Sequence, residues 1–544
     1  MLQSVLVVGA GPTGLSMAAE LARHGVQCRV IDKAQAPSEK SKAIVLQART
    51  LEVLSLMQLA DDFVAAGHPV HAGSIYSNGK RILHIRFDNL DSTYPYILLL
   101  AQPQTERILG DRLRQLGVTV ERGVELLSLS QDAEKATVEL RAHNGRTERS
   151  RVDWVVGCDG PHSTVRRALG IPFEGHAFEQ VFVLADVHVE SRFTDSEAHI
   201  FSEHGDICAI FPLGNGRYRV IADNPPMNLA GRDPTLDECQ GMVNTRMHER
   251  VTLSEPEWIA SFRVNSRLVK ELRSRRVFLA GDAAHIHSPA GGQGMNTGIQ
   301  DALNLAWKLA LVCSGRSDPS LLDSYQSERY PVERSVLRQT DVMFRVAGAS
   351  SGLGAFIRQH VAPLLGSLDF VQHEAARIVS EIGIEYEHSP IVEDHYVPHG
   401  PRAGDRAPDA VARLAPDGAT IHVLDVCSRP QHTLLIIVDA PVHVELADDV
   451  SRKIVASYGD VITPVIVSDA TQPRDNAGVP SITGASTRLP GSLRDEYGSV
   501  RPAMYLVRPD GYIGFRAPLK ASTDDLTQYL ARLMPHRPWE SRAC

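Results

Sequence analysis

Three glycines near the start of the chain, Gly9, Gly11 and Gly14, have the spacing of a loop that binds a pyrophosphate. The β-branched, apolar residues 4–8 predict a buried parallel strand before the loop, and a helical pattern follows it. Gly9 allows a tight turn and Gly11 lets the backbone approach the phosphates, whose charge the helix N-terminus stabilises. The glycines and the elements around them therefore predict a dinucleotide site.

A carboxylate completes this first motif. Residues 28–31 predict a second strand, and Asp32 at its end is placed to accept hydrogen bonds from a ribose hydroxyl. Pro12 and Thr13 in the loop, and Lys33 after the strand, are the other predicted binding residues of this region. These residues alone do not separate FAD from NAD.

Two later motifs each carry an Asp beside a Gly at the end of an apolar strand. One runs through residues 154–160 and contains Asp159, and the other runs through residues 277–298 and contains Asp282. The second continues through a loop rich in Pro and Gly into a predicted helix at about 297–312. A single Asp-Gly pair is often a plain turn, but three ordered motifs about 120–150 residues apart are not expected by chance.

These motifs resemble class A flavoprotein monooxygenases, the family that includes para-hydroxybenzoate hydroxylase, phenol hydroxylase and the aromatic polyketide hydroxylases. The resemblance covers residues 1 to about 390. It implies FAD as the bound cofactor. No second GxGxxG follows the first, which fits a family in which NADPH or NADH binds transiently as the electron donor.

The resemblance also implies roles for individual residues. Asp282 would accept hydrogen bonds from the FAD ribityl chain, and Asp159 would serve both FAD and the nicotinamide cofactor. Backbone N–H groups at Gly294, Met295 and Asn296 would face the flavin pyrimidine, where a helix N-terminus stabilises negative charge. The predicted cofactor-binding set is Gly9, Gly11, Pro12, Thr13, Gly14, Asp32, Lys33, Arg49, Gln104, Asp159, Gly281, Asp282, Pro289, Gly292, Gly294, Met295 and Asn296.

Three of these residues are also the predicted catalytic residues: Arg49, Pro289 and Gly292, although the flavin itself carries the chemistry. Arg49 matches the family arginine that contacts FAD near the active site, and without the resemblance it is a surface helix arginine. Gln104 matches the family glutamine on the ribityl side, and without the resemblance it is a residue beside a helix start.

The expected fold class is α/β. A Rossmann-like FAD-binding domain (1–75, 101–180 and 270–390) is interleaved with a mostly antiparallel β-sheet substrate domain (76–100 and 181–269). Residues 400–544 alternate predicted strands and helices and resemble the thioredoxin-like domain of the phenol hydroxylase branch; they lack CxxC, so a structural role is expected. Candidate pocket residues, each of which is otherwise simple core, are Tyr96, Leu98, Phe201 and Phe211.

Composition narrows the function classes further. The chain has 56 Lys and Arg against 65 Asp and Glu, a formal charge of −9, which argues against non-specific nucleic-acid binding. Seven scattered cysteines predict a reducing, cytoplasmic location, and no apolar run is long enough to span a membrane. His285 and His287 form an HxH pair, but no third ligand has suitable spacing, so no metal site is predicted.

The predicted function is an FAD-dependent, NAD(P)H-consuming monooxygenase. The resemblance implies that a flavin C4a-hydroperoxide hydroxylates a phenolic or polyketide-type aromatic ring. The predicted partners are therefore a small aromatic (phenolic) substrate and dioxygen, with no nucleic acid and no membrane, and a homodimer is possible. The alternatives are a related flavoprotein epoxidase or oxidase, and a non-catalytic FAD-binding protein.

Overall fold

A six-stranded sheet forms the centre of the N-terminal region in the computed structural model, which describes residues 4–225, 232–288, 291–347, 369–414, 420–468, 481–484, 493–498, 502–520 and 523–535. Its order is β18 (Arg273–Ser274), β19 (Val277–Leu279), β12 (Trp154–Gly157), β1 (Val5–Val8), β2 (Cys28–Asp32) and β8 (Val120–Arg122). Neighbours are parallel except β18 and β19. Because β1, β12 and β19 are parallel, the loops after them leave the same edge of the sheet.

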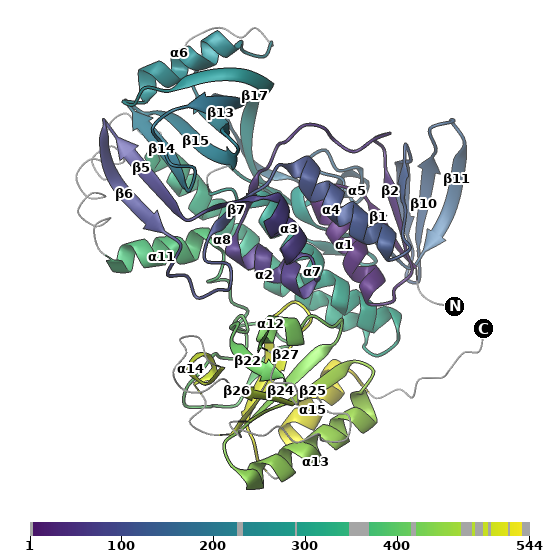
Figure 1. The fold of residues 1–544 in the computed structure, drawn as a ribbon. Helices are drawn as coiled ribbons and strands as arrows, with labels where there is room; N and C mark the ends of the chain where they lie inside the picture. The colour runs from purple at the N-terminus through teal and green to yellow at the C-terminus, as the bar shows by residue number, and fades with distance from the viewer. Residues whose placement is uncertain are drawn as a thin grey trace.

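Helices surround this sheet. α1 (Pro12–Arg23) packs against α4 (Gln102–Gln115) and α7 (Gly294–Cys313), and the three lie side by side at the centre of Figure 1. α7 is buried along nearly its whole length, so it belongs to the core. The other helices of this region are α2 (Ala48–Leu56), α3 (Ala60–Ala66), α5 (Thr164–Ala168), α8 (Asp323–Ala347) and α11 (Asp369–Val379).

Two small three-stranded sheets flank the core. One is an excursion between β8 and β12, built from β9 (Glu125–Gln131), β10 (Ala136–Arg141) and β11 (Thr147–Val152). The other joins β3 (Val45–Leu46), β7 (Ile97–Leu99) and β4 (His68–Val70), which lie next to the substrate sheet.

An eight-stranded sheet forms the predicted substrate domain. Its order is β20 (His285–Ile286), β17 (Thr252–Leu268), β13 (Glu174–Glu190), β16 (Arg217–Asp223), β15 (Asp206–Gly214), β14 (Glu197–Glu203), β5 (Ala72–Ser77) and β6 (Lys80–Arg86). Only β14 and β5 pair in parallel within it. α6 (Leu236–Arg246) covers one face (Figure 1), and the other face meets β4 and β7.

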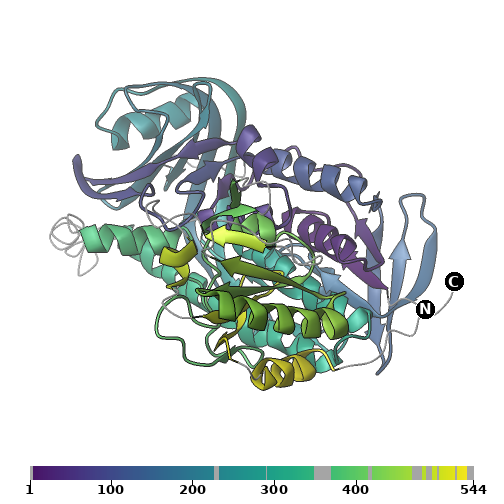
Figure 2. The same cartoon turned by 60° about the horizontal axis from the view of Figure 1, so that its bottom comes forward.

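A second eight-stranded sheet forms the C-terminal module, defined as residues 393–535. Its order is β21 (Glu393–Asp394), β28 (Ile513–Pro518), β27 (Ala503–Val507), β24 (His432–Val438), β25 (Ile462–Ser468), β26 (Ser481–Gly484), β22 (Val411–Leu414) and β23 (Thr420–His422). Its helices are α12 (Val423–Val426), α13 (Pro441–Tyr458), α14 (Leu493–Tyr497) and α15 (Asp524–Leu533), and Figure 2 brings this module to the front.

The α/β fold class is confirmed, with a Rossmann-type sheet and a mostly antiparallel second sheet. β5 and β13 begin at Ala72 and Glu174, before the boundaries expected at 76 and 181. The thioredoxin-like character of the C-terminal module stays a prediction. Among the described helices, none is both long and apolar enough to cross a bilayer.

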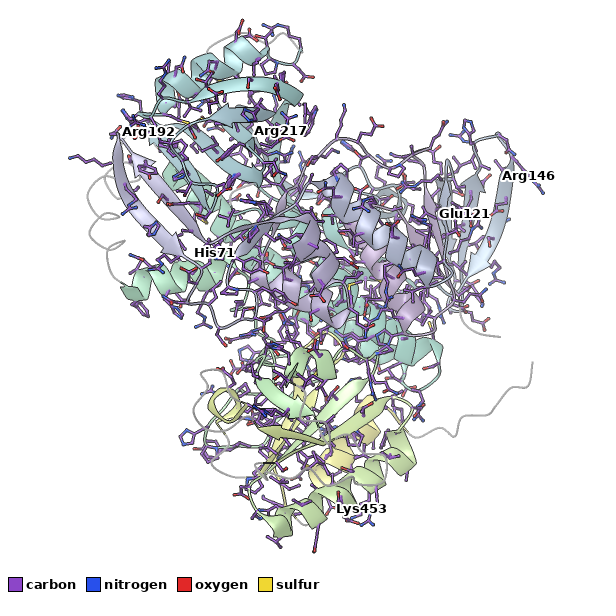
Figure 3. The ribbon with its side chains drawn as sticks, viewed as in Figure 1. His71, Glu121, Arg146, Arg192, Arg217 and Lys453 are labelled. Atoms are coloured by element: carbon purple, nitrogen blue, oxygen red, sulfur yellow. The ribbon has the colours of Figure 1, made fainter. Side chains whose placement is uncertain are left out.

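Three side chains labelled in Figure 3 mark two ends of the molecule. Arg217 of β16 and Arg192 of the loop after β13 lie at the substrate sheet, and Lys453 of α13 lies at the far end of the C-terminal module. The three loops that follow β1, β12 and β19 lie between these extremes.

Candidate active site

The three predicted motifs meet at one edge of the central sheet. We call residues 9–14, 159–160 and 281–282 the loop junction. Backbone hydrogen bonds hold its strands in register, from Cys158 N to Val8 O (2.8 Å) and from Ala280 N to Gly157 O (3.0 Å). The tertiary structure thus brings together residues more than a hundred positions apart in sequence.

The glycines of the first loop are needed for this approach. Gly9 has φ +103°, and a Cβ there would lie 2.3 Å from the Cys158 carbonyl oxygen. A Cβ at Gly14 would lie 2.0 Å from the Gly9 carbonyl oxygen. Nothing lies within 4 Å of the corresponding point at Gly11, the N-cap of α1, which has no side-chain cap. The first N–H groups of α1, including that of Thr13, therefore suit a phosphate.

Asp32 is held at the junction by the backbone. Its Oδ2 accepts a hydrogen bond from Ala10 N at 2.7 Å, and its Oδ1 accepts one from Ala34 N at 2.8 Å. Arg122 Nη1 lies 3.5 Å from Oδ2. Each carboxylate oxygen keeps capacity for a further donor such as a ribose hydroxyl. Lys33 beside it is exposed.

Asp159 ties the second motif to a helix start. Its Oδ2 accepts hydrogen bonds from Thr164 N (2.6 Å) and Val165 N (3.2 Å) at the start of α5. Its Oδ1 is buried and has no hydrogen-bond partner among the described residues. An orphaned buried carboxylate oxygen is costly, so a ligand donor at this position fits the structure.

Arg166 links the second motif to the third, a role that the motif alone did not indicate. Its guanidinium donates to Ala283 O (2.9 Å) and Pro161 O (2.8 Å), and it stacks over Phe173 at 3.9 Å. The only signal in the sequence was an arginine at a fixed distance after Asp159.

Asp282 presents its side chain to solvent at the junction, whereas Gly281 and Ala283 on either side are buried. The surrounding protein raises the pKa of the Asp282 carboxyl, and the charges of His285 and Lys42 oppose that rise. Among the described residues none donates a hydrogen bond to this carboxylate, so its oxygens are available to ligand hydroxyls. Gly281 N donates to Asp301 Oδ2 at 3.0 Å, which fixes the loop.

The third motif continues into the N-terminus of α7. Asn296 Nδ2 donates to Val45 O (2.9 Å) and Gly292 O (2.8 Å), and Asn296 Oδ1 accepts from Gln47 N (2.9 Å). The Asn296 side chain is therefore structural. The N–H groups of Gly294 and Met295, at the start of a 20-residue helix, have no intrahelical acceptor.

Gly292 and Gln104 are also placed by the structure. Gly292 has φ +64°, and a Cβ there would lie 2.7 Å from the Val45 Cβ, so the loop passes tightly over β3. Gln104 is exposed in the first turn of α4. Pro289 lies outside the described residues.

Arg49 does not point to the loop junction. It is fully buried, donates to Glu52 Oε2 and to the Asp510 carbonyl oxygen (both 2.9 Å), and lies 4.6 Å over the Tyr512 ring. The surface alternative is wrong, because the side chain is buried, and the flavin contact stays a prediction. Glu52 lies on the same helix, but Asp510 and Tyr512 come from the C-terminal module, which no local pattern near residue 49 reveals.

The candidate pocket residues divide between the two faces of the substrate sheet. Phe201 packs with Met242 and Val243 of α6, on the face away from β3 and β7. Phe211 packs with Val45 and with other apolar residues beside the α7 loop. Strand alternation separates the two, because Phe201 pairs with Cys208, an odd number of residues from Phe211. Leu98 and Tyr96 belong to the main core.

Comparison with known proteins identifies the family. A family model described as FAD binding domain matches residues 3–340. The chain is 35% identical to 6-methylpretetramide 4-monooxygenase of Streptomyces rimosus, over 97% of this chain and 93% of that protein. The chain belongs to the FAD-dependent aromatic monooxygenases.

A second relative and a solved structure support the same family. This monooxygenase is 34% identical to pentachlorophenol 4-monooxygenase of Sphingobium chlorophenolicum, over 95% of this chain and 94% of that protein. Among solved structures, the anhydrotetracycline hydroxylase of Streptomyces rimosus superimposes with a TM-score of 0.77 at 29% identity, over 99% of this chain and 100% of that one. FAD binding and aromatic hydroxylation are thereby shown for the family and this chain.

Proposed function

We propose that this monooxygenase hydroxylates a polycyclic phenolic ring of the polyketide type, with NADPH or NADH as electron donor and dioxygen as co-substrate. The support is its similarity over nearly its whole length to enzymes named for tetracycline-type substrates. A homodimer and a cytoplasmic location stay predictions.

The loop junction provides the proposed FAD site. Asp32 would hold the ribose and the α1 N-terminus the pyrophosphate, while Asp282 and the α7 N-terminus would hold the ribityl chain and the flavin ring. FAD when bound supplies the two-electron and oxygen chemistry. The protein's part is to orient the substrate and to exclude water.

A hydrophobic cluster of buried and partly buried side chains lies next to the α7 loop. It is formed by Ile44, Val45, Val70, Ile97, Leu99, Ala198, Phe211 and Leu213, from β3, β4, β7, β14, β15 and the adjoining segments. Val45 contacts the Gly292 loop, so this cluster adjoins the expected flavin position. We propose that its partly buried members, which include Phe211 and Leu213, contact the apolar rings of the substrate.

The test is NADPH and NADH oxidation by the FAD-loaded enzyme with tetracyclic, angucyclic and single-ring phenols. We expect the polycyclic phenols to accelerate oxidation and the product mass to rise by one oxygen atom. Acceleration by single-ring phenols alone would contradict the proposed substrate class.

Two alternatives from the sequence remain distinguishable in this assay. An epoxidase would add oxygen to a ring without restoring a phenol, which product structure would reveal. A non-catalytic FAD-binding protein would show no substrate-stimulated oxidation.

A further inference from the structure

A cluster of buried ionisable groups lies directly behind the loop junction. We call His285, Asp301, Arg329, Glu333 and Glu381 the acid cluster; they come from β20, α7, α8 and the segment after α11. Each is at most 2% exposed. The flavin chemistry described above does not use any of them.

The cluster is built around Asp301. His285 Nε2 lies 2.8 Å from Asp301 Oδ2, and Arg329 Nε donates to Asp301 Oδ1 at 2.7 Å. Glu333 Oε1 lies 3.8 Å from His285 Nε2, and neither Glu333 oxygen has a hydrogen-bond partner among the described residues. The sequence analysis found no third ligand beside His285 and His287, yet the structure brings Asp301 and Glu333 within 4.8 Å of His285.

Counting charges shows that this cluster must retain protons. With every group ionised, three carboxylates oppose Arg329 and one imidazolium, which leaves a net negative charge out of contact with water. Burial of an unpaired charge is costly, so protonation of a carboxyl relieves it. A bound metal ion would neutralise the cluster less well than a proton. Asp301 already accepts hydrogen bonds from Gly281 N, His285 and Arg329, and a metal ion would lie beside the Arg329 cation.

The electrostatics agree with this count. Burial raises the pKa of Glu333 and of Glu381 to about 8. Burial alone would lower the pKa of His285, but Glu333 and Asp301 outweigh it and raise that pKa to about 9. Near neutral pH Glu333 and Glu381 therefore both keep a proton while His285 is charged.

The cluster also reaches the loop junction. Asp301 Oδ2 accepts the Gly281 N–H, and Gly281 directly precedes Asp282. The His285 charge favours the ionised form of Asp282. His287, whose own pKa burial lowers to about 4, is neutral near pH 7 and adds no charge.

We propose that the acid cluster is a proton-binding site that couples FAD binding at Asp282 to pH, with Glu333 as the group that takes up the proton. The inference rests on the proposed position of FAD beside Asp282. A proton on Glu333 removes a negative charge 3.8 Å from His285, whose own charge acts on Asp282. FAD, which is itself anionic, should then bind more tightly to the protonated form.

The first test measures the FAD dissociation constant of the refolded apoprotein between pH 6 and pH 9.5 by flavin fluorescence. We expect the wild-type constant to rise roughly threefold to tenfold as the cluster deprotonates, and Glu333→Gln to reduce that rise, with the remainder due to Glu381. Glu374→Gln, at an exposed site on α11, is the matched control and should follow the wild type. An equal pH dependence in Glu333→Gln and wild type would overturn the proposal.

A second measurement needs no variant and so does not depend on whether Glu333→Gln folds. Calorimetry of FAD binding at pH 8, in buffers with different ionisation enthalpies, should show net proton uptake that vanishes at pH 6. Heats independent of the buffer would overturn the proposal, and so would a stoichiometric metal ion in the purified protein. Failure of the wild type to bind FAD at any pH would instead remove the cofactor assignment itself.

Discussion

Asp282 is the residue on which the candidate site depends most, because its carboxylate is exposed while its neighbours are buried. Asp159 and Asp32 are largely occupied by backbone N–H groups. An exposed carboxylate that accepts no hydrogen bond from the described residues, at a point where three loops converge, has both oxygens available to ligand hydroxyls.

Asp282→Ala should lower FAD affinity by roughly a hundredfold while the fold persists, because hydrogen bonds to a charged acceptor each contribute about 1.5–3 kcal/mol. The ratio of flavin to protein absorbance and the thermal midpoint measure the two effects separately. Asp195→Ala, in an exposed loop, should alter neither. Full flavin occupancy in Asp282→Ala would remove Asp282 from the site.

At the scale of elements, the site depends on how closely α1 approaches α7. A Cβ at Gly281 or at Gly298 would lie 2.4 Å from the Thr13 Oγ1, so Thr13 fits between two glycines where the helices meet. This packing places the α1 and α7 N-termini, the two expected anion sites, on the same side of the molecule. Larger residues here would separate them.

Gly298→Ala should therefore destabilise the protein by about 1–3 kcal/mol and weaken FAD binding. Thr13→Ala removes the nearest obstructing atom, so the double variant should regain part of the loss. Denaturant unfolding of the wild type, the two single variants and the double variant gives the coupling. Additive effects would show that the two residues do not share this space.

At the scale of the whole molecule, the C-terminal module is bound to the core through buried ion pairs. Arg508 pairs with Glu328 of α8 (2.6 Å) and with Asp510, and Trp307 Nε1 of α7 donates to Asp510 Oδ2 (3.1 Å). Lys308 also pairs with Glu328 at 2.7 Å, and these two cations hold the pKa of Glu328 well below its usual range despite burial. The module is therefore part of the scaffold that supports α7.

Arg508→Met should cost about 3–5 kcal/mol of stability, because it leaves Glu328 and Asp510 buried without their shared cation. Chemical unfolding and limited proteolysis of the full chain would detect the loss and the exposure of the junction. Arg402→Met, at an exposed site on the same module, should change stability by less than about 0.5 kcal/mol. A comparable change in both variants would argue against a special role for the Arg508 pairs.

Much of the fold followed from local patterns. The strands at 432–438 and 503–507 have the predicted bounds, and α7 begins three residues before the predicted Thr297. These elements are apolar runs or helical repeats bounded by turn residues. Residues close together in the sequence are therefore enough to determine them. The three-stranded excursion β9–β11 had no comparable signal, because β9 and β11 are largely exposed and contain no long apolar run.

The sequence by itself determined the cofactor motifs, since glycines and terminal carboxylates at fixed spacing have few other uses. Only the tertiary structure determined which residues the long buried side chains contact. It turned Arg49 toward Asp510 and Tyr512, and it assembled His285, Asp301 and Glu333 from three elements. The reason is physical: a backbone pattern sets the direction of a Cβ, but the partners of a buried charge come from whatever element packs against it.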